Sequence, residues 1–416
     1  MIKKKIINDP VHGFIDIPQG LIYEVVEHPF FQRLRNIKQL GLSYLVYPGA
    51  CHSRLSHALG AMHLMREAIA VLRSKGTEIF SDEEEAACCA MLLHDLGHGP
   101  FSHALEQYVL TGVAHEDISM ALVCQMNRQM KGALDQTIAI MDGSHPKRFL
   151  HQLLAGQLDV DRLDYLSRDS FYSGVAEGMI GVERIIKMML VHNNELMVEA
   201  KGIYSVEKFL ISRHLMYWQV YLHKTVVGAD ELLIQILRRA RSLASQGQAL
   251  PSVPALAFLL HHHEGTLDVN DPKVLEAFVQ LDDADIDSAV KCWRFVPDKI
   301  LSRLSEMLCN RHLPAVEFAA KPFGTQRVAA ERLKVSRQLG ISKAETDFFV
   351  QHKSVVNRGY NFDEDEIKIM YHDGSVRDIH EVSDLLSARP FSQVTKKYFL
   401  CTPKLKTGEP AALQGT

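Results

Sequence analysis

Residues 87–103 read ACCAMLLHDLGHGPFSH, an apolar run that ends with a histidine beside an aspartate. The run predicts a buried helix over residues 82–97, and Ser81 with the acidic residues after it makes a good N-terminus for that helix. A histidine and a carboxylate that emerge together from a buried helix suit a core poorly, but they suit an Fe, Mn or Zn ion. His94 and Asp95 are therefore the first two candidate metal ligands.

Two further candidate ligands lie in other segments that are also expected to be helical. His57 ends the segment SRLSH, and Asp161 lies in LDVDRLDY. Four such side chains could hold one divalent cation between helices of a bundle, with a position left open. A bound cation lowers the pKa of water and polarises a phosphoryl oxygen, so the set indicates hydrolysis of a phosphate ester or anhydride. A plain helix end at Gly97 would explain one histidine but not the whole set.

The composition is that of an ordinary globular protein. The 416 residues are 47% hydrophobic and 23% charged, and the net charge of −4 gives no support to nucleic-acid binding. No apolar stretch reaches the roughly 20 residues that span a bilayer, and the N-terminus lacks the apolar region of a signal peptide. Seven cysteines without a CxxC pair indicate reduced thiols. The sequence therefore predicts a cytoplasmic protein without a membrane partner.

The apolar pattern predicts a mainly α-helical bundle with short N-terminal and internal β-hairpins and a small C-terminal α+β appendage. Helices are expected over residues 21–28, 29–40, 52–74, 82–97, 101–111, 115–130, 145–155, 158–170 and 205–244, and again between 273 and 312. Hairpins are expected within residues 1–20, at Asn193-Asn194 and at Asp373-Gly374. The expected division is a core at 1–313, with the metal site within 50–170 and a substrate helix at 205–244, followed by an appendage and tail at 314–416.

Five motifs, taken in order, resemble those of a known family. They are DPVHGFIDI at 9–17, FQRLRNIKQLG at 31–41, YPGACHSRLSH at 47–57, LLHDLGHGPFSH at 92–103 and LDVDRLDYLSRD at 158–169. Together they resemble the HD-superfamily triphosphohydrolases that act on deoxynucleoside triphosphates, a group with bacterial members and a mammalian enzyme that carries SAM and HD domains. The resemblance covers about residues 3–240. It implies an HD-domain helical bundle and a reaction that releases deoxynucleoside and inorganic triphosphate.

The resemblance also implies one divalent metal ion in each active site. Its ligands would be the four residues already singled out, His57, His94, Asp95 and Asp161. Two imidazoles and two carboxylates suit Fe, Mn, Zn, Ni or Mg, so the sequence does not identify the metal.

Cationic and aromatic side chains for a nucleotide recur at helical spacing in two segments. They are Arg213, Tyr217, Tyr221 and Lys224 in one segment, and Asp161, Tyr165 and Asp169 in the other. A tyrosine stripe is also typical of core packing, and for Tyr217 the two interpretations stay equally open.

By resemblance, the triphosphate would be bound by four cationic side chains, Arg54, Arg162, Arg213 and Lys224. Gln39 and Asp169 match residues that hydrogen-bond the sugar 3′-hydroxyl. Tyr165 and Tyr221 match aromatic residues that crowd the 2′ side of the sugar, which implies steric exclusion of ribonucleotides.

The resemblance further implies an acid–base group, whose members are His98, His103, Glu106 and His115. A histidine titrates near neutral pH and can protonate the 5′ oxygen that leaves the α-phosphate. His115 matches the family's proposed general acid, and a carboxylate at position 106 would orient it and raise its pKa. The spacing of His94 and His98 places them on one face of the expected helix.

Lys5, Asn8, Gln32 and Arg35 match an activating-nucleotide site that lies at a subunit interface in the family. Glu27 stands at the position that reads a guanine there. Without the resemblance, the same residues would be interpreted as a surface helix stripe and a solvated terminus. The resemblance thus implies a homo-oligomer, a dimer or a tetramer, with a nucleotide as substrate and a second nucleotide as possible activator.

Two other functions stay open from the sequence. An HD-domain nucleotidase or phosphodiesterase that acts on another phosphorylated nucleotide would not release inorganic triphosphate. A non-catalytic sensor of nucleotides or single-stranded nucleic acid would bind its ligand without turnover and with strong salt dependence.

Overall fold

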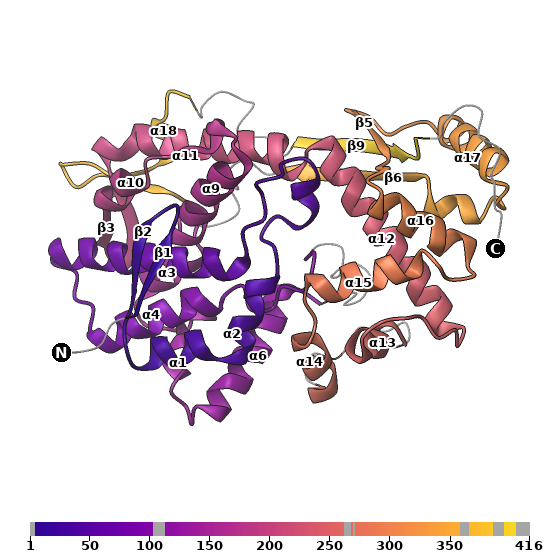
Figure 1. Ribbon diagram of the computed structural model, residues 1–416. Coiled ribbons are helices and arrows are strands. Elements are labelled where there is room, and N and C mark those ends of the chain that lie inside the picture. The colour runs from indigo at the N-terminus through magenta and orange to yellow at the C-terminus, as the bar shows by residue number, and fades with distance from the viewer. Residues whose placement is uncertain are drawn as a thin grey trace.

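The computed structural model describes residues 5–102, 113–261, 268, 271–357, 366–385 and 395–404. Helices dominate this part of the chain and small sheets accompany them, so the predicted fold class is confirmed (Figure 1). Among the described residues no helix has the length and apolar character needed to cross a membrane.

The N-terminal segment is a hairpin followed by short helical turns. Strands β1 (Lys5–Asp9) and β2 (Gly13–Ile17) are antiparallel, and α1 (Leu21–Glu27), α2 (Pro29–Gln32), η1 (Arg33–Asn36) and η2 (Gly41–Leu45) follow. The predicted helix at 29–40 is therefore wrong beyond residue 36. Ile37 adopts an extended conformation with φ −113° and ψ 116°, and Lys38 forms an isolated bridge with Ser53. This tertiary pairing overrides the local helical pattern.

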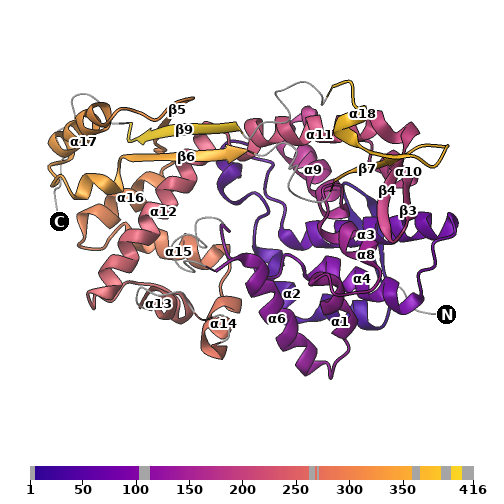
Figure 2. The same ribbon diagram turned by 180° about the vertical axis from the view of Figure 1, so that it is seen from behind.

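Three long helices form the centre of the fold. Helix α3 (Arg54–Ser74) packs against both α4 (Ser81–Leu93) and α9 (Val160–Ser173). Three further helices lie beside them: α6 (His115–Gln129), α7 (Asp135–Met141) and α8 (Arg148–Ala155). Figure 2 shows α6 and α8 near α4. Sequence analysis did not predict α7. The three long helices carry the candidate metal ligands on their facing sides.

A second hairpin and a broken helix follow. After η3 (Ala176–Gly178) and α10 (Val182–Met188), strands β3 (Met189–His192) and β4 (Glu195–Glu199) pair through Asn193-Asn194, as predicted. Both asparagines have positive φ, 51° and 63°, which suits a tight hairpin turn. The single helix predicted over 205–244 is wrong. The chain instead forms η4 (Ala200–Gly202), α11 (Ile203–Met216), a π-helical turn η5 (Tyr217–Tyr221) and α12 (Lys224–Ser245).

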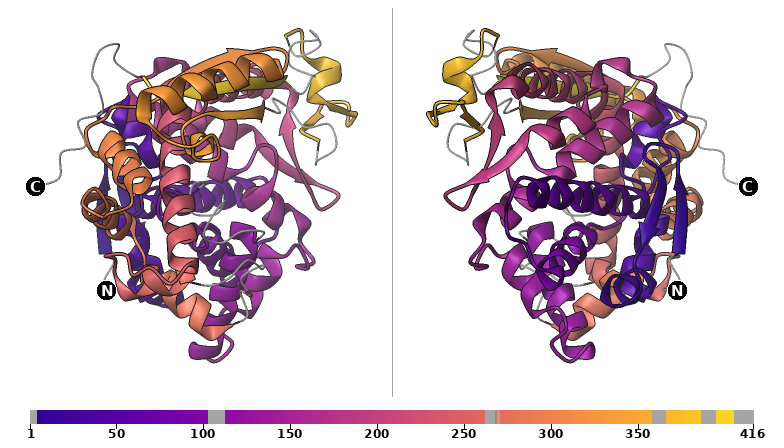
Figure 3. Two further views of the ribbon diagram at one scale, coloured as in Figure 1. Left: turned by 90° about the vertical axis from the view of Figure 1, so that its right-hand side faces the viewer. Right: turned by 90° about the vertical axis from the view of Figure 1, so that its left-hand side faces the viewer.

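The remaining chain supplies further helices and strands. Its helices are α13 (Pro254–His261), α14 (Pro272–Val279), α15 (Asp283–Trp293), α16 (Lys299–Cys309), α17 (Thr325–Leu339), η6 (Glu345–Phe348) and α18 (Ile379–Val382). Its strands are β5 (Ala315–Ala319), β6 (Gln351–Asn357), β7 (Lys368–Met370), β8 (Val376–Asp378) and β9 (Thr395–Thr402). Of these elements, α13, α16 and β5 pack directly on α12. One sheet has the order β5-β9-β6, with α17 beside it (Figure 3).

The C-terminal strands are divided between two places. While β5, β6 and β9 pack near α12, β7 pairs parallel to β4 and thereby joins the sheet β3-β4-β7-β8. The predicted boundary at residue 313 stays a prediction, because part of the segment after it adds strands to the hairpin of the core.

Candidate active site

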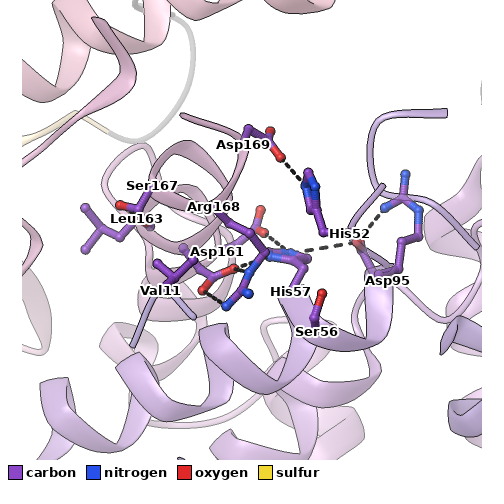
Figure 4. Close-up of polar contacts among 12 residues, drawn as sticks. Val11, His52, Ser56, His57, Asp95, Asp161, Leu163, Ser167, Arg168 and Asp169 are labelled. Atoms are coloured by element: carbon purple, nitrogen blue, oxygen red, sulfur yellow. Dashed lines mark hydrogen bonds and ion pairs between the residues drawn. The ribbon is translucent and has the colours of Figure 1, made fainter. Parts of the chain in front are cut away.

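Three of the four predicted metal ligands come together from three helices. His57 lies in α3, His94 directly follows α4, and Asp161 lies in the first turn of α9. One ligand atom of each lies within 4.8 Å of the others. Asp161 Oδ1 is 2.9 Å from His57 Nε2 and 3.3 Å from His94 Nε2. Figure 4 shows His57 and Asp161 facing each other across this cluster.

Both imidazoles face the cluster with their Nε2 atoms, because their Nδ1 atoms are hydrogen-bonded elsewhere. His57 Nδ1 donates to Asp164 Oδ2 at 2.8 Å, and His94 Nδ1 donates to the Met91 carbonyl at 2.8 Å. These bonds fix the proton on Nδ1 and leave the Nε2 lone pair for a metal, the arrangement typical of metal-binding histidines. The two Nε2 atoms are buried and lack a partner in hydrogen-bonding geometry. The residues present therefore fit a divalent cation.

Asp95 lies at the edge of the cluster. Its carboxylate is 3.3 Å from His94 Nε2 and 3.8 Å from His57 Nε2, and Arg54 NH1 binds it at 2.6 Å. Arg54 also donates to Ser102 Oγ at 2.9 Å. Asp95 thus links the candidate metal ligands to a candidate phosphate-binding arginine, and its role as fourth ligand stays a prediction.

Burial and ion pairing shift the pKa values of these groups in opposite directions. Burial disfavours charge on His57, but Asp161 and Asp164 raise its pKa to about 10, so a cation that binds here has to displace the proton from His57 Nε2. Burial likewise opposes ionisation of Asp95 and Asp161, yet the neighbouring histidines and, for Asp95, Arg54 hold the pKa of each below its usual range. The carboxylates are therefore ionised at neutral pH, as metal ligands must be.

The turn after α4 is held by residues outside the motif that sequence analysis did not single out. Arg33, which is buried, donates to the carbonyls of Leu96, His98 and Leu281. Burial lowers the pKa of Arg33 to about 9. Asp283 accepts from the Phe101 amide at 3.1 Å, at a residue whose φ of 50° is left-handed. Such strain persists only where surrounding contacts impose it.

The helix that leads to the doublet ends at Leu93, so the prediction that His94 and His98 share a helical face is wrong. The turn still brings His98 to the site, where its Nε2 lies 3.4 Å from Asp95 Oδ1. His98 stacks on His115, the first residue of α6, with ring centroids 3.9 Å apart. His103 and Glu106, and most of the helix expected at 101–111, lie outside the described residues.

Several candidate sugar-binding residues surround Asp169. Its carboxylate accepts from His52 Nε2 at 2.7 Å and from the Tyr221 hydroxyl at 2.8 Å, and Figure 4 shows the pair with His52. Tyr165 packs edge-on against Tyr221, with ring centroids 6.3 Å apart, and also contacts the His57 ring. The Gln39 Oε1 atom is buried without a hydrogen-bond partner. His52 was not predicted.

The four candidate phosphate-binding cations have different environments. Arg54 is bound to Asp95, and Arg162 is bound to Asp159 and to the Gly156 carbonyl. Arg213 has buried Nε and NH1 atoms without a hydrogen-bond partner. Lys224 is exposed.

The break in the predicted helix separates four candidate nucleotide-binding residues that were expected along one helix. Arg213 stays in α11, Tyr217 and Tyr221 form the ends of the π-helical turn, and Lys224 starts α12. The two tyrosine rings contact each other edge-on at 5.3 Å. Single π-helical turns inside helices occur frequently at functional sites.

The four candidate activator residues are partly linked to one another at the surface. Lys5 forms an ion pair with Glu27 at 2.6 Å, Gln32 donates to the Val26 carbonyl, and Arg35 donates to Gln32 Oε1 at 2.9 Å. Asn8 lies on β1, opposite Phe14 of β2. No contact in the described residues tests an activator.

Comparisons with known proteins identify the family of the chain. A family model described as the HD domain matches residues 54–169, which include all four candidate ligands, and one described as the HD associated region matches residues 180–247. The crystal structure of a phosphohydrolase from Bacteroides thetaiotaomicron is 53% identical, covers 97% of this chain and 100% of its own, and has a TM-score of 0.94.

Two proteins of similar sequence extend the comparison. The uncharacterized protein YwfO of Bacillus subtilis is 35% identical over 319 residues, which are 75% of this chain and 71% of that protein. The human deoxynucleoside triphosphate triphosphohydrolase SAMHD1 is 31% identical over 289 residues, which are 57% of this chain. The match spans 44% of the human protein, so less than half of that enzyme is represented.

Proposed function

This chain belongs to the HD-domain phosphohydrolases, which are metal-dependent enzymes, and from that premise we propose that it hydrolyses deoxynucleoside triphosphates to deoxynucleoside and inorganic triphosphate. The human and Dictyostelium relatives named for this activity are 31% and 34% identical to it. The substrate is a proposal, since those matches span 44% and 46% of the named enzymes.

One observation carries the proposal: two buried imidazole Nε2 atoms converge on the Asp161 carboxylate, 2.9 and 3.3 Å from its Oδ1 atom. Two nitrogen lone pairs and a carboxylate oxygen that meet at one buried point are a donor set that suits a divalent cation. His57, His94, Asp161 and, at the edge, Asp95 would hold a divalent cation there. Such a cation lowers the pKa of water and polarises a phosphoryl oxygen when bound.

Protein side chains around the cluster would bind the triphosphate. Arg213 offers two buried N–H groups that have no acceptor, and a phosphate oxygen would satisfy them with charge-assisted hydrogen bonds. Arg54 and Arg162 are already paired with Asp95 and Asp159 and would share their donors with the substrate. Exposed Lys224 adds a mobile positive charge.

Proton transfer to the leaving 5′ oxygen would come from the stacked histidines. His98 and His115 lie beside the cluster, and His98 contacts the Asp95 carboxylate. We assign the proton donor to His115, whose side chain is 31% exposed and so reaches the substrate space, while His98 is nearly buried. His103 and Glu106 complete the proposed group.

Sugar selection would depend on Asp169 and the tyrosines. His52 and Tyr221 hold the Asp169 carboxylate, which then accepts from a 3′-hydroxyl at its remaining lone pairs, assisted by the free Gln39 Oε1. Tyr165 and Tyr221 lie edge to face beside it, with Tyr217 packed on Tyr221. A 2′-hydroxyl placed against these rings would be buried without a partner, which disfavours ribonucleotides.

The test is a panel of deoxynucleoside and ribonucleoside triphosphates, with Mn²⁺ or Mg²⁺, scored for inorganic triphosphate. We expect triphosphate from deoxynucleotides and little from ribonucleotides. Release of phosphate or pyrophosphate instead would support another HD-domain nucleotidase or phosphodiesterase, and salt-dependent oligonucleotide binding without turnover would support a sensor.

Asp161→Ala tests the metal centre directly. We expect loss of bound metal by elemental analysis and a fall in turnover of roughly a thousandfold, because a catalytic cation contributes several kcal/mol. Asp82→Ala, at the exposed N-terminal end of α4, is the matched control and should keep both. Full metal content and full activity in Asp161→Ala would rule the site out.

We also propose an activating nucleotide at Lys5, Asn8, Gln32 and Arg35, between subunits of a homo-oligomer. The support is that Lys5, Glu27, Gln32 and Arg35 lie together on one surface. Rate against deoxynucleotide concentration should be sigmoidal, or should rise when GTP is added. A hyperbolic curve that GTP and dATP leave unchanged would contradict activation.

A further inference from the structure

We propose that the turn between β1 and β2 is part of the metal centre, because its His12 positions the Asp164 carboxylate that orients His57. His12 is a positioning residue and does not touch the metal. The inference rests on the proposed metal role of His57. It extends the metal centre from His57 toward the N-terminus as far as His12, into a hairpin that packs on α3.

Asp164 is the centre of this arrangement, since each of its carboxylate oxygens accepts two hydrogen bonds. Oδ1 accepts from His12 Nε2 at 2.6 Å and from Arg168 NH2 at 2.9 Å. Oδ2 accepts from His57 Nδ1 at 2.8 Å and from Arg168 Nε at 2.9 Å. A carboxylate has about four lone-pair sites, and all of them are used. Its orientation is therefore fixed, and so is the direction in which the His57 ring points.

The turn itself is tied into the same network through Asp9. Asp9 Oδ1 accepts from the backbone amides of Val11 and His12, both at 2.9 Å, and Asp9 Oδ2 accepts from Arg168 NH1 at 2.7 Å. The bonds close a ring that runs from Asp9 to Arg168, Asp164, His12 and back to Asp9. His12 can therefore not leave Asp164 without a change in the conformation of the turn.

Burial makes each bond in this ring important. The side chains of Asp164 and Arg168 are fully buried, and that of His12 is 10% exposed. A buried charge that loses a partner is costly, so without His12 the Asp164 carboxylate would turn its Oδ1 atom toward Arg168, the other donor to that oxygen. Rotation would weaken the bond to His57 Nδ1, which fixes the tautomer and orients Nε2. Loss of such an outer contact typically reduces metal affinity about 10–100-fold.

Two substitutions of His12 separate hydrogen bonding from packing. His12→Leu replaces the imidazole with an apolar side chain of similar size and so removes the donor, whereas His12→Gln keeps an N–H donor at similar reach. The dissociation constants of Mn²⁺ and Zn²⁺ are measured for the full chain, stripped of metal, by calorimetry and by competition with a chromophoric chelator. His12→Leu should weaken metal binding about 10–100-fold, and His12→Gln should stay close to the unsubstituted protein.

His63→Leu is the matched control. His63 lies on α3 with its ring centroid 5.7 Å from that of His12, but it pairs with Glu67 at 3.4 Å. It should leave metal affinity unchanged, and the unfolding temperature of each metal-free variant shows whether the fold is kept. If His12→Leu does not fold, Asp9→Asn, which weakens the same ring at its outer corner, should reduce metal affinity in its place.

The outcomes separate the inference from the proposed function. The role of the turn would be overturned if His12→Leu left the metal affinity unchanged, or if His12→Leu and His12→Gln weakened metal binding equally. Unchanged metal affinity in a folded Asp9→Asn would overturn it as well. If His57→Ala binds metal as tightly as the unsubstituted protein, then the metal site itself is misplaced and the proposed function fails with it.

Discussion

Replacing Gly60 with alanine tests whether the buried hydrogen-bonded groups around Asp164 leave any space beside α3. Gly60 lies in the middle of α3 and is buried. A Cβ atom built there would lie 2.1 Å from Arg168 NH2 and 2.1 Å from Asp164 Oδ1, against an ordinary contact of 3.4–4 Å. Neither atom belongs to a free side-chain end, because both take part in the ring of hydrogen bonds around Asp164.

Two effects of opposite sign decide the result. Alanine in a helix is favoured over glycine by about 1 kcal/mol. Overpacking costs about 1–3 kcal/mol, and breaking a buried ion pair costs about 3–5 kcal/mol. We therefore expect Gly60→Ala to lower the free energy of unfolding by at least about 2 kcal/mol, a partial disruption of the pair being enough. Urea denaturation of the metal-free protein, followed by circular dichroism, measures it.

Gly324→Ala is the matched control, because a Cβ atom at this exposed position meets no atom within 4 Å. Its effect should stay below about 1 kcal/mol. If Gly60→Ala were as stable as the unsubstituted protein, or more stable, then Arg168 and Asp164 would not lie where the structure has them, and the reasoning on the network would be refuted.

Three further substitutions test other parts of the structure. Burial favours the neutral acid at Asp298, but hydrogen bonds from Arg239 and the Leu301 amide hold its pKa below the usual range. Asp298→Asn should therefore lower the free energy of unfolding by about 1 kcal/mol above roughly pH 4. This difference should disappear as pH falls through the lowered pKa, and a difference that grew toward acid pH would contradict the direction of the pKa shift. Arg213→Met should raise the KM for deoxynucleotides about tenfold or more with a smaller effect on kcat, and an unchanged KM would remove Arg213 from the phosphate site. Asp283→Ala should speed amide exchange of residues 96–102 by about tenfold, since it releases the Phe101 amide; equal protection in both proteins would show that the strained turn does not depend on it.

Much of the candidate site could be predicted from the local sequence pattern. The apolar run before His94 specifies a buried helix, and the doublet at its end specifies the chemistry, because few other uses explain an imidazole beside a carboxylate at that place. The spacing of His57 and Asp161 in separate amphipathic segments then indicates a site between helices. The hairpin at Asn193-Asn194 was predictable for the same local reason, since asparagine tolerates the positive φ of a tight turn.

Predictions failed where contacts distant in sequence override local preference. The helical pattern at 205–244 is continuous, but the chain breaks after the π-helical turn, and the C-terminal sheet packs there. Leu222 and Val227, on either side of the break, contact a cluster with Phe399 and Cys401 of β9, and Lys397 lies over the Trp218 ring at 3.5 Å. None of these partners is visible in the local pattern of the helix.

The sequence by itself determined the helical class, the hairpins and the identity of the candidate metal ligands, because periodicity and turn chemistry are short-range properties. Only the tertiary structure decided that His12, His57 and Arg168 share the Asp164 carboxylate. It also decided that Arg33 and Asp283 hold the turn after α4. The physical reason is that a buried charge must find its partners wherever the chain brings them. Those partners are up to 248 residues apart here, as between Arg33 and Leu281. No short-range pattern encodes such a pairing.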